Sequence, residues 1–209
     1  MKNYSKKSTF PLFESVCVLD GQIQHSIWHE KRFLTSFLRH FKKNPQYALF
    51  DNINLKNSPS DRAKLRITYG EKEKYWELTP YFFHPIRSLQ LVEDNHIDYS
   101  IKWENRTALD ALFLARGNCD DVLIVKNGQL TDTSYGNIAL LREGTWFTPQ
   151  DPLLEGTARA RLLDEKKIVS KSITLENLHT FERFKMINAL RDFNTDSSYP
   201  VSQIKPMDF

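Results

Sequence analysis

Cysteine is scarce in this sequence: only two of its 209 residues are cysteines, Cys17 and Cys119. They lie far apart in the chain and form neither a disulfide framework nor a metal-binding spacing, which suits a reducing compartment. The six histidines have no clustered cysteine partners, so the sequence predicts no metal site.

Long apolar runs are absent as well. No run approaches the ~20 residues that a membrane-spanning helix needs, so no membrane partner is expected. The first residues, M-K-N-Y-S-K-K-S-T, are not followed by the apolar region of a signal peptide, and we therefore expect a cytoplasmic protein. The net charge of +3 could attract an acidic substrate or a polyanion, although such a balance more often serves only solubility.

Glycine is limited to seven residues, and none of them forms a nucleotide-binding loop. The patterns G-x-x-x-x-G-K-[S/T] and G-x-G-x-x-G do not occur. No module that recognises nucleic acid is found either, so no nucleic-acid partner is expected. The aromatic stretch Tyr75–Phe83 is interpreted as core and interdomain packing rather than as a base-stacking platform.

What the chain does contain is enough apolar sequence for one large domain or two small ones, with 40% hydrophobic and 26% charged residues. In the first part the periodicity predicts a strand over Phe13–Leu19, a hairpin turn at Asp20-Gly21, a helix over Trp28–Phe41, a loop over Asn54–Asp61, and a hairpin of Leu65–Tyr69 with Tyr75–Thr79. A connection near His84 then divides the chain into a small N-terminal domain, residues 1–84, and a C-terminal domain, residues 85–209.

The second part is again a mixture of short elements. The predicted elements, in chain order, are strands at Ser88–Val92 and Asp98–Ile101, a helix over Arg106–Arg116, strands at Val122–Val125, Ile138–Leu141 and Trp146–Thr148, helices at Gly156–Leu163 and Leu175–His179, and a strand at Arg183–Asn188. Because strands and helices do not alternate regularly, the pattern favours an α+β fold over a doubly wound sheet.

The segment from Tyr99 to Asn137 carries the most chemical information. Lys102 follows a short β-like run and stands just before an apolar helix, and Asp132 is expected in a polar loop after the next strand. One lysine and one carboxylate at the edges of elements are what a pyridoxal phosphate enzyme needs. The amine forms a Schiff base with the cofactor aldehyde, and the carboxylate pairs with the protonated pyridine nitrogen.

Four motifs extend this pattern over most of the chain. They are I-K-W-E-N-R (101–106), T-D-T-S-Y-G-N-I (131–138), F-T-P-Q-D-P-L-L-E-G-T-A-R (147–159) and M-I-N-A-L (186–190). In this order they resemble the class IV pyridoxal-phosphate enzymes, which include branched-chain and D-amino acid aminotransferases and 4-amino-4-deoxychorismate lyase. The resemblance implies a two-domain α+β enzyme of fold type IV with its active site between the domains. It also implies pyridoxal 5'-phosphate as cofactor and a homodimer.

The resemblance also assigns roles to residues. Lys102 would hold the cofactor and then act as the general base at the substrate α-carbon. Asp132 falls where the family usually has glutamate, and its alternative role is that of a turn residue. Arg32, in H-E-K-R-F (29–33), matches the arginine that binds the cofactor phosphate, and its alternative is a surface arginine on an amphipathic helix.

Two further phosphate contacts are predicted. Thr157 and Ala158 lie at an expected helix start, where N–H groups and the helix dipole favour an anion. The family often has a hydroxyl residue at the position of Ala158, whereas here Thr157 carries the hydroxyl. Asn188 resembles the last phosphate contact of the lyase branch, and its alternative role is that of a strand end.

The motifs favour 4-amino-4-deoxychorismate lyase, which forms 4-aminobenzoate and pyruvate. I-K-x-x-N-R and I-N-A-L look more like that branch, and the chain is short for the larger branched-chain enzymes. The alternative is a branched-chain or D-amino acid aminotransferase; both act on a small-molecule amine or amino acid. A hypothesis from another class is a non-catalytic protein that binds pyridoxal phosphate, or a basic protein that binds nucleic acid.

Overall fold

The computed structural model describes residues 10–56, 58–59, 61–195 and 197–207. The first nine residues, on which the expectation about a signal peptide rests, and two residues of the expected loop Asn54–Asp61 lie outside this part. The chain splits into two compact units. Unit 1 comprises Met1–Phe82 and Ile101–Asn105, and unit 2 comprises Phe83–Ser100 and Arg106–Phe209. The division into domains 1–84 and 85–209 remains a prediction.

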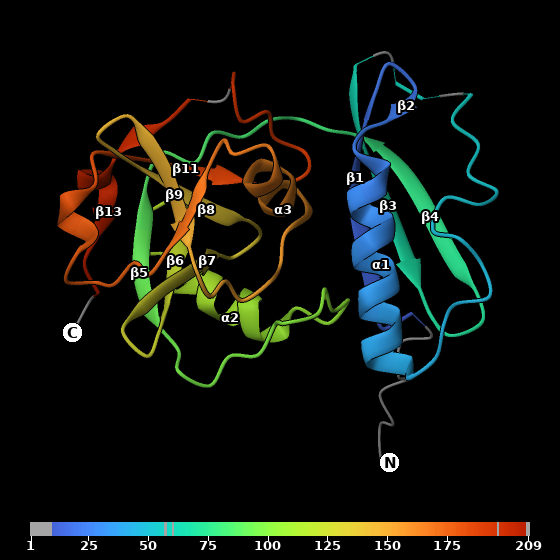
Figure 1. Ribbon diagram of the computed structural model, residues 1–209, viewed down its shortest axis with the longest axis horizontal. Coiled ribbons are helices and arrows are strands. Elements are labelled where there is room, and N and C mark those ends of the chain that lie inside the picture. Colours follow the sequence, from blue (N-terminus) through green and yellow to red (C-terminus); the bar gives the residue numbers. More distant parts are fainter. Residues whose placement is uncertain (1–9, 57, 60, 196, 208–209) are drawn as a thin grey trace. The chain divides into compact units, whose positions relative to one another are not determined.

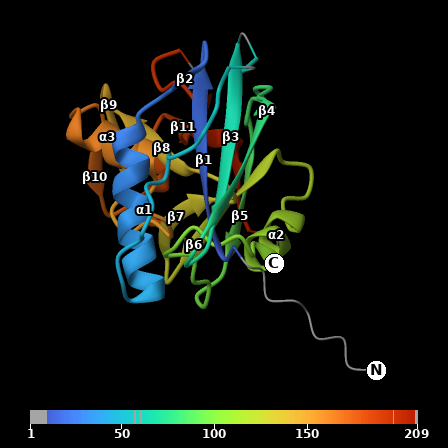
Figure 2. The same ribbon diagram turned by 90° about the vertical axis from the view of Figure 1, so that its right-hand side faces the viewer.

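Unit 1 is a four-stranded sheet with one helix on it. The strand order is β2-β1-β3-β4, and the elements are β1 (Leu12–Leu19), β2 (Gln22–Ile23), α1 (Ser26–Phe41), β3 (Arg62–Tyr69) and β4 (Lys74–Pro80). Figures 1 and 2 show α1 lying along β1 and β3. Phe33 and Phe37 of α1 are fully buried in the core that α1 forms with the two central strands.

The predicted hairpins of unit 1 are present. Asp20 and Gly21 have positive φ angles of 48° and 73°, which is the backbone geometry that connects twisted antiparallel strands with two residues. β1 pairs antiparallel with β3 from Leu12↔Tyr69 to Leu19↔Arg62. The sheet therefore carries its even-numbered β1 residues and its odd-numbered β3 residues on the face covered by α1.

Unit 2 is a larger mixed sheet with two helices. Its main strand order among the described residues is β10-β9-β8-β7-β6-β5-β13, with β11 paired to β8 and β12. The elements are β5 (Leu89–Glu93), α2 (Thr107–Leu114), β6 (Asp121–Lys126), β7 (Gln129–Thr133), β8 (Asn137–Arg142), β9 (Thr145–Pro149), α3 (Thr157–Asp164), β10 (Val169–Lys171), β11 (Arg183–Ile187), β12 (Tyr199–Pro200) and β13 (Ile204–Lys205), with 3₁₀ turns at Leu178–Thr180 and Val201–Gln203. Its core centres on fully buried residues such as Leu123, Ile138 and Phe184.

Three expectations about local structure were wrong. The aromatic stretch Tyr75–Phe83 is not a core segment, because Tyr75, Phe82 and Phe83 are 60%, 74% and 45% exposed. Asp98–Ile101 is not a strand; the Asp98 carboxylate accepts a hydrogen bond from the backbone N–H of Ser100 at 3.0 Å, which bends the chain. Asp132 does not lie in a polar loop but in β7, whose residues 130–133 are buried. The α+β class is confirmed, because strands and helices mix without regular alternation.

Among the described residues, none of the helices is both long enough and apolar enough to cross a membrane. Within the same part of the chain, no group of three or more His, Cys, Asp or Glu side chains is placed to hold a metal ion.

Candidate functional site

Lys102 is held by the backbone of unit 1. Its carbonyl accepts a hydrogen bond from the N–H of Phe13 at 3.1 Å, and the N–H of Glu104 donates to the carbonyl of Pro11 at 2.8 Å. A bridge between Leu12 and Trp103 completes a short antiparallel pairing along the start of β1. The lysine is thus fixed to the edge of the sheet in the manner of an added strand, although it is far from β1 in sequence.

The side chain of Lys102 lies over an aromatic ring. Its Nζ is 4.5 Å from the centroid of the Phe13 ring, a distance at which a cation is attracted to the ring face. Phe13 is 3% exposed, so this contact lies in a largely desolvated place. A lysine that is fixed at its backbone and held at its amine fits a nucleophile that must stay in position.

On the other face of β1, Glu14 is fully buried and contacts two residues of α1. His29 Nδ1 is 2.7 Å from one carboxylate oxygen, and Arg32 donates from Nε at 2.7 Å and from Nη2 at 2.5 Å. His29 and Arg32 are three residues apart, so they share one face of the helix. The buried carboxylate therefore binds the Arg32 guanidinium in a two-pronged ion pair and fixes its direction.

The charges of this cluster explain its protonation. Burial alone would raise the pKa of Glu14, but the charge of Arg32 and hydrogen bonds from His29 and Arg32 lower that pKa to about 2. Burial is the main cause that lowers the pKa of His29, and the nearby Lys102 charge lowers it further. His29 is therefore neutral near pH 7 and donates through Nδ1.

In unit 2 the central residue is Asp132. It pairs directly with Asn137 across the turn of the β7–β8 hairpin. Asn137 Nδ2 donates to Asp132 Oδ1 at 2.7 Å, and the backbone N–H of Leu154 donates to Oδ2 at 2.9 Å. Asp132 is 4% exposed, and burial raises the pKa of its carboxyl to about 7 although both hydrogen bonds lower it.

The loop before α3 is fastened to the same hairpin. Asn137 Nδ2 also donates to the carbonyl of Leu154 at 2.9 Å. Gly156 follows, and a Cβ atom there would lie 1.9 Å from Asn137 Oδ1, so a larger residue would displace the Asn137 side chain. α3 then begins at Thr157, and Thr157 and Ala158 are both buried. The N-terminus of α3, with its N–H groups and positive dipole end, is thus set by the Asp132–Asn137 pair.

Asn188 lies beside these residues in the fold. It directly follows Ile187, which pairs with Asn137 in the β11–β8 ladder. Its Oδ1 accepts a hydrogen bond from the N–H of Leu190 at 2.9 Å, and its carbonyl accepts one from the N–H of Arg191. Asn188 therefore shapes the turn after β11, and phosphate contact remains a prediction for it.

The predicted site residues accordingly fall into two groups. Unit 1 brings together Arg32 and Lys102. Unit 2 places Asp132, Thr157, Ala158 and Asn188 around one hairpin and the start of α3.

Three contributors to these groups were not predicted: Glu14, His29 and Asn137. The five-residue spacing of Asp132 and Asn137 could have indicated the latter, had their segment been interpreted as a hairpin. His29 also stands four residues after His25, but it binds Glu14 rather than a metal.

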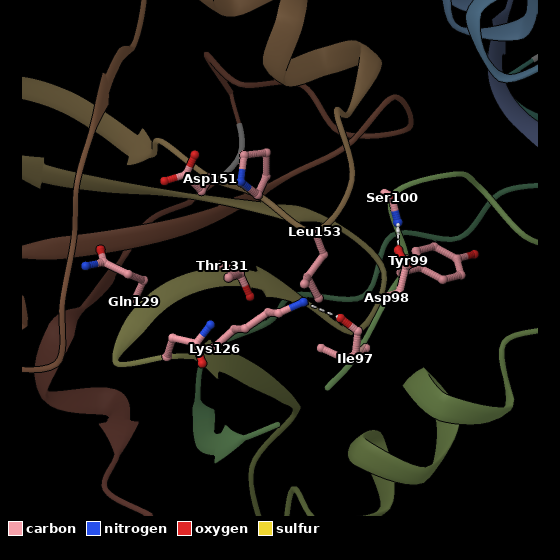
Figure 3. Close-up of a pocket in the computed structure, with 11 residues that line it drawn as sticks. Ile97, Asp98, Tyr99, Ser100, Lys126, Gln129, Thr131, Asp151 and Leu153 are labelled. Atoms are coloured by element: carbon pink, nitrogen blue, oxygen red, sulfur yellow. Dashed lines mark hydrogen bonds between the residues drawn. The ribbon is translucent and has the colours of Figure 1, made fainter. Parts of the chain in front are cut away.

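Unit 2 also contains a separate hollow of about 340 Å³. Figure 3 shows Lys126 reaching across it, with Nζ donating to the carbonyl of Ile97 at 2.6 Å. Thr131 lines the hollow, and because side chains alternate along β7, Asp132 points to the other side of the strand. No predicted site residue lines this hollow, and we assign it no role.

Known proteins resemble this chain in sequence and structure. The family model of class IV amino-transferases matches residues 86–194. An uncharacterised protein of Haemophilus influenzae is 35% identical over 184 residues, 87% of this chain and 98% of that protein. The chain belongs to the class IV aminotransferase family. The resemblance inferred from the motifs is thereby confirmed, and with it an enzyme of the pyridoxal-phosphate-dependent lyase or aminotransferase type.

Two solved structures illustrate the family. A proposed 4-amino-4-deoxychorismate lyase from Haemophilus somnus is 34% identical, with a TM-score of 0.84, over 88% of this chain and 98% of that chain. A proposed amino-acid aminotransferase from Mesorhizobium loti is 18% identical, with a TM-score of 0.74, over 94% of this chain and 99% of that chain. The second likeness concerns the fold alone.

The residues present fit the family cofactor, pyridoxal 5'-phosphate. A buried carboxylate with a raised pKa, such as Asp132, gains most from a cationic partner, which a protonated pyridine nitrogen supplies. A phosphate dianion suits the start of α3, where Gly156 leaves room and supplies no capping side chain. In unit 1, Lys102 carries an amine of the kind that reacts with the cofactor aldehyde, and the Arg32 guanidinium is of the kind that binds a phosphate.

Proposed function

We propose that this enzyme is a 4-amino-4-deoxychorismate lyase, which releases 4-aminobenzoate and pyruvate. The observation that carries the proposal is the likeness to the Haemophilus somnus structure, whose own assignment is a proposed lyase of this kind. At 34% identity this likeness spans 98% of that chain, so both proteins share the same short architecture. The lyase-like motifs I-K-x-x-N-R and I-N-A-L point the same way.

Each residue group has a share in the proposed reaction. When bound, pyridoxal phosphate supplies a conjugated ring that accepts the electrons left by a departing proton. Lys102 attaches the cofactor and is then the base that takes the proton from the substrate carbon bearing the amine. Asp132 keeps a proton on the pyridine nitrogen. Arg32, Thr157, Ala158 and Asn188 anchor the phosphate.

The elimination balances without another reactant. Lys102 takes the proton from the amine-bearing carbon, and the enolpyruvyl group leaves from the neighbouring carbon with the electrons of its carbon–oxygen bond. The departing group takes up a proton and becomes pyruvate, while the six-membered ring becomes aromatic as 4-aminobenzoate. The substrate amine is retained in the product, so no amino-group acceptor is needed.

An aminotransferase acting on a branched-chain or D-amino acid is the second candidate. The description of the matched family favours it. Such an enzyme gives up the substrate amine to its cofactor and stops after one half-reaction unless a keto acid is added.

The deciding experiment supplies aminodeoxychorismate without any keto acid. We expect many turnovers with one pyruvate per 4-aminobenzoate. The lyase proposal fails if aminodeoxychorismate is not converted, while an amino acid removes the visible absorbance of the bound cofactor once and a keto acid restores that absorbance.

The same assay tests Lys102. Lys102→Ala should lose borohydride-fixable cofactor, and its turnover should fall by several orders of magnitude because nucleophile and base are removed together. Lys72→Ala, an exposed lysine in the same unit, should behave like the parent. Normal turnover by Lys102→Ala would remove the lysine from the mechanism.

A homodimer belongs to the proposal as well. Ile27, Leu34 and Leu38 are exposed on α1 at helical spacing, so this face offers apolar surface to a second copy. Light scattering on the purified holoenzyme should give twice the mass of the 24.6 kDa chain.

A further inference from the structure

The face of the unit 1 sheet opposite α1 is basic along β3. Arg62, Lys64 and Arg66 are half-buried at alternate positions of this strand, while the residues between them are buried in the core beneath α1. Because side chains alternate along a strand, the three basic residues share one face. Phe13 of β1 lies on this face too, since it occupies an odd-numbered position.

Arg66 and Lys102 meet at the ring of Phe13. The guanidinium carbon of Arg66 is 3.9 Å from the ring centroid, and Lys102 Nζ is 4.5 Å from the same point. The two cations are therefore no more than 8.4 Å apart, the sum of those two distances. The Arg66 guanidinium thus lies close to the Lys102 amine, at which a substrate would react.

Arg66 keeps donors for a further anion. Its Nη2 donates to Glu104 Oε1 at 2.9 Å, and its Nε is 4.0 Å from Glu77, beyond hydrogen-bond distance. Among the described residues, no hydrogen-bond partner is found for Nη1. The Arg66 side chain is 21% exposed and that of Glu104 is 38% exposed. Such half-exposed pairs contribute little to stability.

We propose that Arg66 binds a carboxylate of the substrate, an inference that rests on the proposed function of Lys102. The ligand class is a carboxylate-bearing amine. In an amino acid only the α-carbon separates the amine nitrogen from the carboxylate carbon. Aminodeoxychorismate carries one carboxylate on the enolpyruvyl group, which is attached next to the amine-bearing carbon, and a second across the ring. The planar guanidinium matches a carboxylate with two parallel N–H donors, and the Phe13 ring and Glu104 hold it at a fixed angle.

The test measures binding rather than turnover. Holoenzyme of the parent and of Arg66→Gln is titrated by calorimetry with two matched pairs of probes: 4-aminobenzoate against 4-aminobenzamide, and pyruvate against pyruvamide. In each pair the second probe lacks the negative charge. The parent should bind at least one acid about 10- to 100-fold more tightly than its amide, and Arg66→Gln should reduce that ratio to about threefold or less.

Controls separate this role from others. Arg62→Gln removes a positive charge from the same face of β3, at the start of the strand, where Arg62 pairs with Leu19. It should keep the parental ratios. Arg66→Lys retains the charge but loses the planar fork, so its ratio should lie between those of parent and Arg66→Gln. If Arg66→Gln does not fold, the ratio measured for Arg66→Lys tests the proposal in its place. Cofactor retention, measured by absorbance, should be unchanged in every variant.

Three results would overturn the proposal. The first is a parent that does not distinguish either acid from its amide. The second is an Arg66→Gln variant that keeps the parental ratios for both pairs. The third is loss of cofactor from Arg66→Gln, which would make the arginine a cofactor ligand. Because the titration needs no turnover, failure of the lyase assay would leave these results interpretable.

Discussion

Two buried carboxylates, one in each unit, have pKa values that are shifted in opposite directions. Glu14 and Asp132 are both almost inaccessible to solvent, yet the pKa of Glu14 falls to about 2 and that of Asp132 rises to about 7. The difference is a cation bound directly to the carboxylate. The charge of Arg159 also lowers the pKa of Asp132, but burial outweighs it. Glu14 is bound by the Arg32 guanidinium, whereas the hydrogen-bond donors to Asp132 are the neutral amides of Asn137 and Leu154.

This difference separates a carboxylate that is neutralised within its own unit from one that is not. A buried carboxylate that is already neutralised within its own unit costs little to keep ionised. A buried carboxylate without a cation is destabilising when ionised and gains from a ligand that brings positive charge. Glu14 therefore organises Arg32, while Asp132 is left to gain from a cationic ligand, which is the role we propose for it beside the cofactor.

The largest expected effect follows from removing the paired charge. Glu14→Gln leaves the Arg32 guanidinium beside a neutral amide in a buried place, and should lower the free energy of unfolding by about 3–5 kcal/mol. Urea denaturation of the apo protein at pH 7 measures it. Glu71→Gln breaks an exposed ion pair with Lys43 in the same unit and should leave the urea midpoint unchanged. A Glu14→Gln variant as stable as the parent would show that the pair contributes nothing to folding.

The second prediction concerns Asp132 and pH. Because its pKa in the folded protein is raised, Asp132 destabilises the fold as pH rises from about 4 towards and beyond 7. Asp132→Asn removes this penalty, so the stability difference between variant and parent should grow by roughly 2–3 kcal/mol between pH 5 and pH 8 in favour of the variant.

Taking the difference between variant and parent cancels His29, which works in the opposite direction. The pKa of His29 is lowered by burial, so its contribution is lost as pH falls. Glu14 titrates below this window, since its pKa is about 2. A stability difference that stays flat from pH 5 to pH 8 would contradict the raised pKa of Asp132. Urea denaturation of both apo proteins at several pH values measures it.

The third prediction tests the coupling of the Asp132 hairpin to α3. Gly156→Ala places a methyl group on the Asn137 side chain, which must then leave Asp132 or Leu154. The expected loss is about 1–3 kcal/mol in the free energy of unfolding. In the double variant with Asn137→Ala the obstructing amide is absent. The double variant should therefore lose less free energy of unfolding than the sum of the losses of the two single variants. Strict additivity in urea denaturation would mean that the loop moves instead.

Sequence alone singled out Lys102 and Asp132 as candidates but not their surroundings. Lys102 and Asp132 stand in motifs whose order identified the family. Asp132 was expected in a loop because T-D-T-S is turn-forming chemistry, and the burial of three successive polar residues in β7 leaves no alternating pattern to detect.

The remaining features depend on contacts between distant segments. Glu14 precedes His29 by fifteen residues and Arg32 by eighteen, so only the packing of α1 on β1 makes a cluster of them. The placement of Lys102 in unit 1 rests on backbone hydrogen bonds to residues 11–13. No local propensity encodes such pairing.

The smallest expected effect is on cofactor affinity. If Asp132 supplies the negative partner of the pyridine nitrogen, Asp132→Asn should weaken binding of pyridoxal phosphate about tenfold, the scale of one hydrogen bond to a charged group. Retention of the cofactor during dialysis, followed by absorbance at pH 8, measures it.

Asp121→Asn is the matched control for that measurement. Asp121 is equally buried in unit 2, and burial also raises its pKa, but it lies at the start of β6 and accepts a hydrogen bond from the N–H of Val122. Its replacement should leave retention unchanged. If both variants lose the cofactor alike, the loss reflects damage to unit 2 rather than a missing charge. If Asp132→Asn keeps the cofactor as the parent does, Asp132 is a buried carboxylate with no ligand to neutralise it.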